Sequence, residues 1–485
     1  MKLQRFDWIV LGCILGLSSA LGGILVRGEQ IPLKVSHFSW EGKKVGLQDK
    51  SFSLTFNRPV DSKSVKENLT IDPPLPGKIS WKGRQLVYTL DSPPIYGTNY
   101  EIKLQNAQRI YDEQPIEPFV NVISTRDRTL AYIGINGEEK GRLILYNITD
   151  VNQSQKTILT PRDLIVTDFK VYPNSSKILF SAYEPNYGRP NIANQQLYTV
   201  STGFQVSPNT IETQRAGKLQ RILGTKDYQN LKFNLSKNGK TIVVWRTNPK
   251  NQADSGLWVI PDEGEPRPLG VPGGEFVISP DGKRVAVAQR GGVGIIPLTP
   301  DAGSSKFLSG YEKSLGFSQE GKQILLIRYN GDYTRSLVLF NREDQTKKDL
   351  FRTLYPIIDC AFEVREEKFL YCLKTDFVEG ESGQYREEPF LSAINIEKTT
   401  DLPLLALPNS RDVQLSMSPD GVALLFDQVV TTVAQSNQDL LTQKNQAIAD
   451  GQVWLLPLPE LKESEESIKI KPEELEPGLK PKWLP

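Results

Sequence analysis

Phe276-Val-Ile-Ser-Pro-Asp-Gly-Lys283 is a short apolar strand pattern that ends in a small polar turn and a lysine, and Val285-Ala-Val-Ala288 resumes the apolar pattern directly afterwards. Further copies of this order lie at Phe233–Lys240, Leu315–Lys322 and Leu415–Gly421. The lysines of the three clearest copies are 43 and 39 residues apart. Short strands separated by turns at this period are typical of the four-stranded blades of a β-propeller. The sequence therefore predicts an all-β fold built from repeated sheets.

The number of blades follows from counting the inner strands. The pattern places inner strands near residues 166, 232, 276, 315, 359 and 414, which gives six. Thr129–Ile133 and Arg142–Tyr146 look like later strands of a further blade that lacks its inner strand. Lys482-Trp-Leu-Pro485 has the pattern of the missing strand. We expect it to pair beside Thr129–Ile133 and complete a seven-bladed ring over residues 126–485. A six-bladed ring with a frayed tail is the alternative.

These repeats resemble the propellers of the periplasmic Tol-system component and of related surface proteins. The resemblance spans most of residues 126–485, and it concerns a fold that serves many functions. It implies an extracytoplasmic domain and does not imply a particular activity.

Residues 31–125 form a separate β-rich segment. Ser51–Phe56 alternates between polar and apolar residues, as a half-buried strand does, and proline and glycine pairs separate several strands of this kind. The segments that carry a family resemblance are Phe56–Asp61, Leu69–Pro74, Gly77–Trp81 and Tyr96–Tyr100. They resemble the bacterial Ig-like domain of S-layer and other surface proteins, which implies a β-sandwich that serves as a spacer or adhesion module.

Residues 1–30 carry the one membrane signal of the chain. Trp8–Val26 is a run of 19 residues without charge, and as a helix it would span about 28 Å at about 1.5 Å per residue. We therefore expect a short cytoplasmic stub and a membrane anchor, with the rest of the chain extracytoplasmic. The alternative is a signal peptide cleaved near Ser18 and Ala20, which would make the protein secreted. A lipoprotein site at Cys13 has too short an apolar stretch before it.

Composition excludes several classes of function. With 58 basic and 57 acidic residues, the chain has no overall charge that favours nucleic acid. Its single histidine, His37, lies outside the repeats, so a Ser-His-Asp triad has no base there. No cluster has metal-ligand spacing and no phosphate-binding loop occurs, so we expect no cofactor. A glycosidase or lyase that uses Asp, Glu, Tyr and Arg stays open as the enzymatic alternative.

Long insertions locate the expected binding face. Glu184–Gln195, Thr375–Pro389 and Gln428–Gly451 each fall between the second and third strands of a blade, and therefore on the same face of the ring. Val430–Ala449 is expected to form a short amphipathic helix. The candidate binding residues are Tyr183, Tyr187, Arg189, Tyr385 and Arg386. Because tyrosine and arginine are enriched at interaction hot spots, we expect a non-catalytic scaffold that binds a protein or glycan of the cell envelope.

Cys360 and Cys372 fall in successive strands joined by a short charged turn. A hairpin centred on Glu366 places them opposite each other, where a disulfide is geometrically possible and would persist in an oxidising compartment. A slip of one residue would instead point them to opposite faces and leave two reduced thiols.

Overall fold

The computed structural model describes residues 5–29, 32–110, 115–150, 154–185, 194–204, 215–379, 385–407, 413–433, 440–442, 446–459, 461 and 470–485. In the first of these stretches only the side chains of residues 8–23 are described. The chain divides into two compact units, Met1–Arg126 and Asp127–Pro485. We describe each unit by itself.

Helix α1 (Arg5–Glu29) covers the segment for which the sequence predicts a membrane anchor. The last side chains of the predicted span, those of residues 24–26, lie outside the described part. Among the residues that the structure describes, no helix combines the length and the apolar character needed to cross a membrane.

The rest of the first unit is a β-sandwich. One sheet has the order β1 (Val35–Phe38), β3 (Ser51–Phe56), β6 (Gln85–Leu90), β5 (Gly77–Lys82). The other has the order β2 (Lys44–Val45), β8 (Phe119–Thr125), β7 (Asn99–Leu104), β4 (Leu69–Asp72). Phe52, Leu54 and Phe56 of β3 are buried in alternation, as the sequence predicts, and they share one core with Ile102 of the opposite sheet. Two sheets that bury their facing sides against each other account for this unit.

A short helix, α2 (Ser62–Asn68), interrupts the strands of the first unit, and the sequence analysis did not predict it. The Asp61 carboxylate accepts a hydrogen bond from the Lys63 N–H at 2.9 Å and so caps the helix. Val65 buries its side chain in the core of the sandwich. A seven-residue helix gives too few turns for a clear helical period, so the cap was its only local signal.

The described residues of the second unit form five four-stranded sheets, each an antiparallel meander in chain order. Their strands are β12 (Ile165–Val171), β13 (Lys177–Tyr183), β14 (Gln196–Ser201), β15 (Leu219–Leu223); β16 (Gln229–Leu235), β17 (Thr241–Thr247), β18 (Gly256–Pro261), β19 (Arg267–Pro268); β20 (Phe276–Ile278), β21 (Arg284–Gln289), β22 (Gly292–Pro297), β23 (Lys306–Ser309); β24 (Lys313–Phe317), β25 (Gln323–Tyr329), β26 (Arg335–Asn341), β27 (Lys347–Thr353); and β28 (Ile357–Phe362), β29 (Phe369–Glu379), β30 (Tyr385–Asn395), β31 (Asp401–Ala406). Their first strands begin close to the inner-strand positions expected from the repeats.

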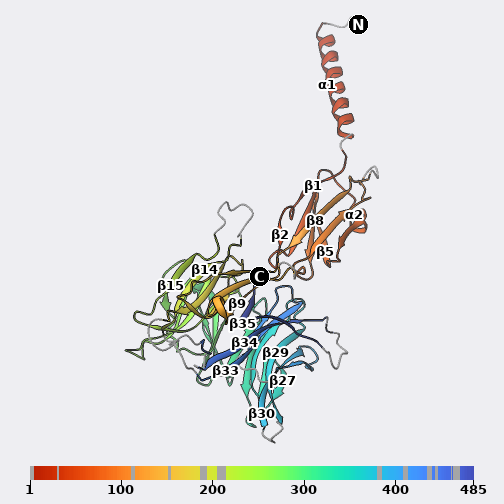
Figure 1. Ribbon diagram of the computed structural model, residues 1–485. Coiled ribbons are helices and arrows are strands. Elements are labelled where there is room, and N and C mark those ends of the chain that lie inside the picture. The colour runs from red at the N-terminus through yellow and green to blue at the C-terminus, as the bar shows by residue number, and fades with distance from the viewer. Residues whose placement is uncertain are drawn as a thin grey trace. The chain divides into compact units, whose positions relative to one another are not determined.

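A sixth, seven-stranded sheet joins both ends of the second unit. Its order is β11 (Gln155–Ile158), β10 (Leu143–Asn147), β9 (Thr129–Gly134), β35 (Glu473–Trp483), β34 (Ala447–Pro457), β33 (Ala423–Thr432), β32 (Leu415–Met417). Short 3₁₀ turns lie at Gly137–Glu139 and Pro300–Ala302. Figure 1 shows β9 beside β35 and β34, although the first lies near the start of the unit and the other two near its end.

The Ser-Pro-Asp-Gly turns explain why the repeats fold as hairpins. The Ser279 hydroxyl donates to the Asp281 carboxylate at 2.5 Å and accepts the Arg284 N–H at 2.9 Å. Gly282 has a φ of +72°, which glycine adopts without steric cost. Ser418, Asp420 and Gly421 repeat the arrangement. The turn residues therefore satisfy their own polar groups and fix the register of the first two strands.

The first strands of the sheets form a closed ring. β12, β16, β20, β24, β28 and β32 are neighbours in this order, β32 is also a neighbour of β35, and β35 is a neighbour of β12. The sheets thus radiate from a common centre in a propeller-like arrangement. We call the space that these strands surround the ring interior.

Strand β35 pairs with two neighbouring strands, β34 and β9. Glu473, Glu474 and Pro477 pair with β34, whereas Gly478–Trp483 pairs with β9, with Leu479 opposite Ile133 and Trp483 opposite Leu130. The predicted pairing of the C-terminal segment with Thr129–Ile133 is therefore present. The backbone oxygen of Pro485 accepts a hydrogen bond from the Ser175 hydroxyl at 2.7 Å, so the last residue is also held.

The prediction of a helix over Val430–Ala449 is wrong for both ends of that range, which form strands. Residues up to Thr432 continue β33, and β34 begins at Ala447. Leu441 forms an isolated antiparallel bridge with Ala447. Residues 434–439 and 443–445 lie outside the described residues. The apolar spacing that suggested a helical face belongs in part to two long paired strands, whose β-branched residues favour extended backbone.

Candidate functional site

Repeated irregularities in the first strands build the ring interior. The register of the first two strands shifts between Val166 and Asp168, and again between Asn230 and Lys232. A third shift precedes Asp359. Each shift inserts one extra residue, as a β-bulge does, and a bulge redirects the side chains that follow it. Charged residues follow all three of these bulges, so charged groups collect where the first strands meet.

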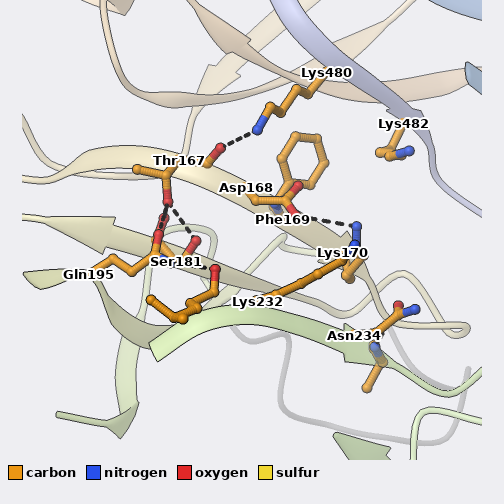
Figure 2. A network of polar contacts seen from close by, with 12 residues as sticks. Thr167, Asp168, Phe169, Lys170, Ser181, Gln195, Lys232, Asn234, Lys480 and Lys482 are labelled. Carbon is orange, nitrogen blue, oxygen red and sulfur yellow. Dashed lines mark hydrogen bonds and ion pairs between the residues drawn. The ribbon is translucent and has the colours of Figure 1, made fainter. Parts of the chain in front are cut away.

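Six charged residues form the group that we call the ring cluster. They are Asp168, Lys170, Asp359, Asp427, Lys480 and Lys482. Three carboxylates stand against three ammonium groups, so the cluster is close to neutral at pH 7. Figure 2 shows Asp168 and Lys170 on one strand with Lys480 and Lys482 approaching from β35.

Asp168 is the carboxylate that the lysines stabilise most. Its Oδ1 accepts the N–H of Phe169 at 2.8 Å, and its Oδ2 lies 3.4 Å from the Lys170 Nζ. Burial raises the pKa of Asp168, but the positive charges of Lys170, Lys480 and Lys482 outweigh burial and lower it to about 2. Asp168 is therefore ionised throughout the physiological range.

Asp427 has the opposite pKa shift. Its Oδ1 accepts the Gln414 N–H at 2.6 Å and its Oδ2 accepts the Lys480 N–H at 2.7 Å. The residue is 1% exposed, and burial raises its pKa to about 6 in spite of these hydrogen bonds. Burial also raises the pKa of Asp359. Asp427 thus ties β32, β33 and β35 together and titrates near neutral pH.

The two lysines of β35 are held by backbone oxygens. The Lys480 Nζ donates to the Thr167 carbonyl at 2.6 Å, and the Lys482 Nζ donates to the Leu415 carbonyl at 3.2 Å. Burial lowers the pKa of Lys482 to about 8, with a further decrease from the charge of Lys170. An ammonium with such a pKa is partly neutral at slightly alkaline pH.

Uncharged groups extend this network to the next sheet. The Thr167 hydroxyl lies 2.6 Å from the Ser181 hydroxyl and donates to the Gln195 Oε1 at 2.7 Å (Figure 2). The Gln195 Nε2 donates to the Asn230 carbonyl at 2.6 Å. Because these groups satisfy one another, the network holds two neighbouring sheets in a fixed relation.

The space beside the ring cluster is small. Three cavities of about 20, 50 and 40 Å³ lie here, and Leu441 and Lys480 line all of them. Leu440 and Thr442 are buried, and each of them lines one of these cavities. A water needs roughly 10–15 Å³, and a small-molecule site has about 300–1,000 Å³. Each of these three cavities therefore has room for one or a few waters.

Exposed apolar side chains gather at one end of three neighbouring sheets. The hairpins β25–β26, β29–β30 and β33–β34 and the link from β27 to β28 meet at this end, because successive strands run in opposite directions. We call the group the aromatic face: Tyr329, Tyr333, Leu354, Ile358, Phe377, Val378, Tyr385, Val430 and Val433. In the described part of the second unit only three other large apolar side chains, those of Phe204, Leu219 and Phe307, are exposed. The concentration at one end marks it as a surface that differs from the rest.

The β29–β30 hairpin carries the centre of the aromatic face. Its strands pair along their full length, from Phe369 opposite Asn395 to Glu379 opposite Tyr385, and Figure 1 shows them side by side. Tyr385 is 67% exposed, and the ring of Phe377 meets that of Tyr355 edge-on at 5.1 Å. A long paired hairpin holds these rings in place without burying them.

Of the five residues that the sequence analysis proposed for binding, those that the structure describes lie in different places. Tyr385 lies on the aromatic face, and Arg386 beside it pairs with Glu388 at 2.6 Å. Tyr183 is 4% exposed and packs in the core beside the ring interior, so it offers no surface for a partner. Tyr187 and Arg189 lie outside the described residues. The sequence analysis missed the ring cluster, for which the charged pairs on either side of Phe169 and of Pro481 were the available signal.

Cys360 and Cys372 are directly opposite each other in the β28–β29 pair and form a disulfide, with 4.1 Å between their Cα atoms. Both residues are buried. We expect the Cys360→Ala/Cys372→Ala variant to lose about 2 kcal/mol of unfolding free energy, the low end for disulfides, because the loop is short and the strands already pair. Denaturant unfolding of the oxidised protein measures the loss. Two titratable thiols in protein purified from its native compartment would contradict the bond.

No protein-family model matches the chain, and no curated protein matches it. Similar solved structures include TolB from Acinetobacter baumannii (12% identity, 86% of this chain, 83% of that chain, TM-score 0.39). A proposed 6-phosphogluconolactonase from Bacteroides uniformis (11%, 74%, 99%, 0.44) and an oligogalacturonate lyase from Vibrio parahaemolyticus (12%, 69%, 97%, 0.39) are also similar. At TM-scores below 0.5 these likenesses give no information on activity.

Proposed function

We propose that the chain is a binding scaffold whose second unit presents the aromatic face to a partner protein. The observation that carries the proposal is the concentration of exposed apolar side chains on that face, with Tyr333 88% and Tyr385 67% exposed. Aromatic residues are enriched at protein interfaces, where they supply much of the binding free energy. The small volume of the cavities beside the ring cluster also favours recognition at the surface over chemistry inside.

The architecture that we propose for this scaffold has seven blades. Five blades are the four-stranded sheets. The seven-stranded sheet supplies two more, divided within β35: Glu473–Pro477 is the outer strand of the last blade and Gly478–Trp483 the inner strand of the first. We further propose an Ig-like assignment for the sandwich of the first unit, as a spacer.

The disulfide supports a location for this scaffold. Disulfides persist in oxidising compartments and are rare in the reducing cytosol. The bonded pair Cys360–Cys372 therefore favours an extracytoplasmic compartment. The partner that we propose belongs to the cell envelope.

Replacing Tyr333 and Tyr385 by alanine tests the proposed face. Truncation of an interface hot spot costs about 2 kcal/mol or more, so we expect each replacement alone to weaken capture of the partner at least about 30-fold, and both together to weaken it further. The measurement is quantitative mass spectrometry of proteins cross-linked to the full-length chain in its native extract. Because both side chains are exposed, thermal unfolding should stay within about 1 °C of the wild type.

The matched control is Phe204→Ala/Leu219→Ala, which removes two exposed apolar side chains from another sheet. A partner retained by the control and lost from the face variant supports the proposal. Equal capture by both variants would overturn it. Binding to a glycan array that is sensitive to the face variant would show a glycan partner in place of a protein.

One observation favours a second candidate, a carboxylate-based enzyme. Asp168 and Asp427 belong to one cluster, yet their pKa values are about 2 and about 6. Carboxylates whose pKa values are driven apart are a common basis of acid and base roles. Release of products from an oligosaccharide by the wild type, abolished in Asp427→Asn, would establish this candidate over the scaffold.

A further inference from the structure

A groove of about 510 Å³ lies between two neighbouring sheets, at the end opposite the aromatic face. Its lining comes from Arg284 at the start of β21, from β22 and β23, and from the turns β24–β25 and β26–β27. Turns between first and second strands and between third and fourth strands share this end of the sheets. The groove is therefore independent of the proposed partner surface, and its volume lies within the range of about 300–1,000 Å³ typical of small-molecule sites.

Positive charge exceeds negative charge in the groove. The charged residues of the lining are Arg284, Lys306, Glu320, Lys322, Arg342 and Glu343. Glu320 pairs with Lys322 at 2.7 Å. Among the described residues, Arg284, Lys306 and Arg342 have no carboxylate within ion-pair distance. Three cations that form no direct ion pair in the described part of the chain thus line one groove.

The two guanidinium groups are held in place by the protein. The Arg342 Nη1 donates to the Gly321 carbonyl at 2.5 Å, and its guanidinium carbon lies 5.6 Å from the centre of the Phe317 ring. The Arg284 Nη1 donates to the Ser304 carbonyl at 3.4 Å. Burial lowers the pKa of Arg342 and the like charge of Arg284 lowers it further, while the charges of Asp281 and Glu343 offset part of this decrease. An anion between the two groups would relieve both effects.

An apolar surface lies next to these cations. Leu308 of β23 is half-buried on the face of its sheet that packs toward Phe340 of the neighbouring sheet, and Ile295 lines the groove beside them. Water-exposed apolar area beside fixed cations fits a ligand that has a charged end and an apolar body. Arginine pairs bind carboxylate and phosphate oxygens through two parallel hydrogen bonds, so either oxyanion suits this end.

We propose that this groove binds a small organic anion, a phosphate ester or a carboxylate, with Arg284 and Arg342 on its oxyanion and Leu308 and Phe340 against its apolar body. Lys306 and the turn at Gly321 complete the charged end. The site follows from residues of two different sheets and needs no part of the aromatic face.

Calorimetric titration of the purified full-length protein tests the groove. The probes are phenyl phosphate and benzoate, with inorganic phosphate and phenol as partial probes that lack the apolar body or the charge. We expect saturable binding of at least one full probe, and weaker binding of both partial probes. The stronger full probe identifies the oxyanion. Replacement of Arg284 or Arg342 by glutamine should weaken its binding at least about tenfold, the loss of a charge-assisted hydrogen bond.

Arg335→Gln is the matched control. Arg335 likewise donates to a backbone carbonyl, that of Leu354 at 2.8 Å, and lies 4.9 Å from a ring, that of Tyr329, but at the other end of β26. It should bind the probe as the wild type does. If Arg342→Gln does not fold, Arg284→Gln decides alone, because Arg284 makes the weaker contact with the backbone. Absence of saturable binding, equal affinity for phenol, or equal loss in Arg335→Gln would overturn the proposal.

Discussion

Deletion of residues 478–485 is expected to prevent the second unit from reaching its stable fold. The deletion removes the half of β35 that pairs with β9, together with the buried side chains of Leu479, Trp483 and Leu484. Loss of one buried tryptophan side chain costs about 3–5 kcal/mol and loss of a leucine about 2–5 kcal/mol. The sum is comparable to the whole stability of about 5–15 kcal/mol that a protein domain has.

Smaller changes to the C-terminal strand should lower stability by smaller amounts. Trp483→Ala should cost about 3–5 kcal/mol, because the ring packs against Leu130 and Tyr132 of β9. Deletion of Pro485 alone removes the hydrogen bond from Ser175 and should cost about 1 kcal/mol. Thermal unfolding and limited proteolysis measure the series. If the protein without residues 478–485 melted like the full chain, the closing strand would contribute nothing to stability.

The second large effect concerns pH, and Asp427 and Asp168 should act in opposite directions. The folded-state pKa of Asp427 is raised to about 6, so folding binds a proton, and its contribution is present at low pH and lost as pH rises through 6. The pKa of Asp168 is lowered to about 2, so its contribution is present above about pH 4 and lost as pH falls toward 2. At 1.36 kcal/mol per pKa unit, these contributions are about 3 and about 2 kcal/mol.

Asparagine variants separate the two contributions. Relative to wild type, Asp427→Asn should lack the gain in unfolding free energy between pH 7 and 4, and Asp168→Asn should lack the fall between pH 4 and 2. Denaturant unfolding at a series of pH values gives both difference curves. Asp262→Asn changes an exposed carboxylate of the same unit and serves as the control. Difference curves that run parallel for all three variants would contradict the shifts at the ring cluster.

The sheets of the second unit could be predicted because their information is local. Ser279, Asp281 and Gly282 satisfy one another within a single turn, so each copy of the motif specifies its own hairpin. The same holds for the alternation in Ser51–Phe56. Even the long-range pairing of β35 could be predicted, because the repeat lacked one inner strand and Lys482–Pro485 had the required pattern.

The site could not be predicted in the same way because it depends on non-local placement. Lys480 and Thr167 share a hydrogen bond although they are 313 residues apart in sequence. A β-bulge between Val166 and Asp168 sets the direction in which the Asp168 side chain leaves its strand. The groove similarly joins Arg284 and Arg342 from different sheets. Tyr183 was expected at the surface because it precedes a long insertion, yet its strand carries it into the core. The sequence pattern predicts where a strand ends, but it does not predict which side chains of that strand another sheet will bury.

The shared strand β35 also constrains the order of events during synthesis. β9 is among the first strands of its unit to leave the ribosome, whereas its partner in Gly478–Trp483 is made last. Until Gly478–Trp483 has been made, β9 has an unpaired edge, the kind of edge that invites pairing with other chains. A nascent or truncated chain is therefore exposed to aggregation for nearly the whole time needed to make the unit. Chaperone occupancy at Thr129–Gly134 would protect it over that interval.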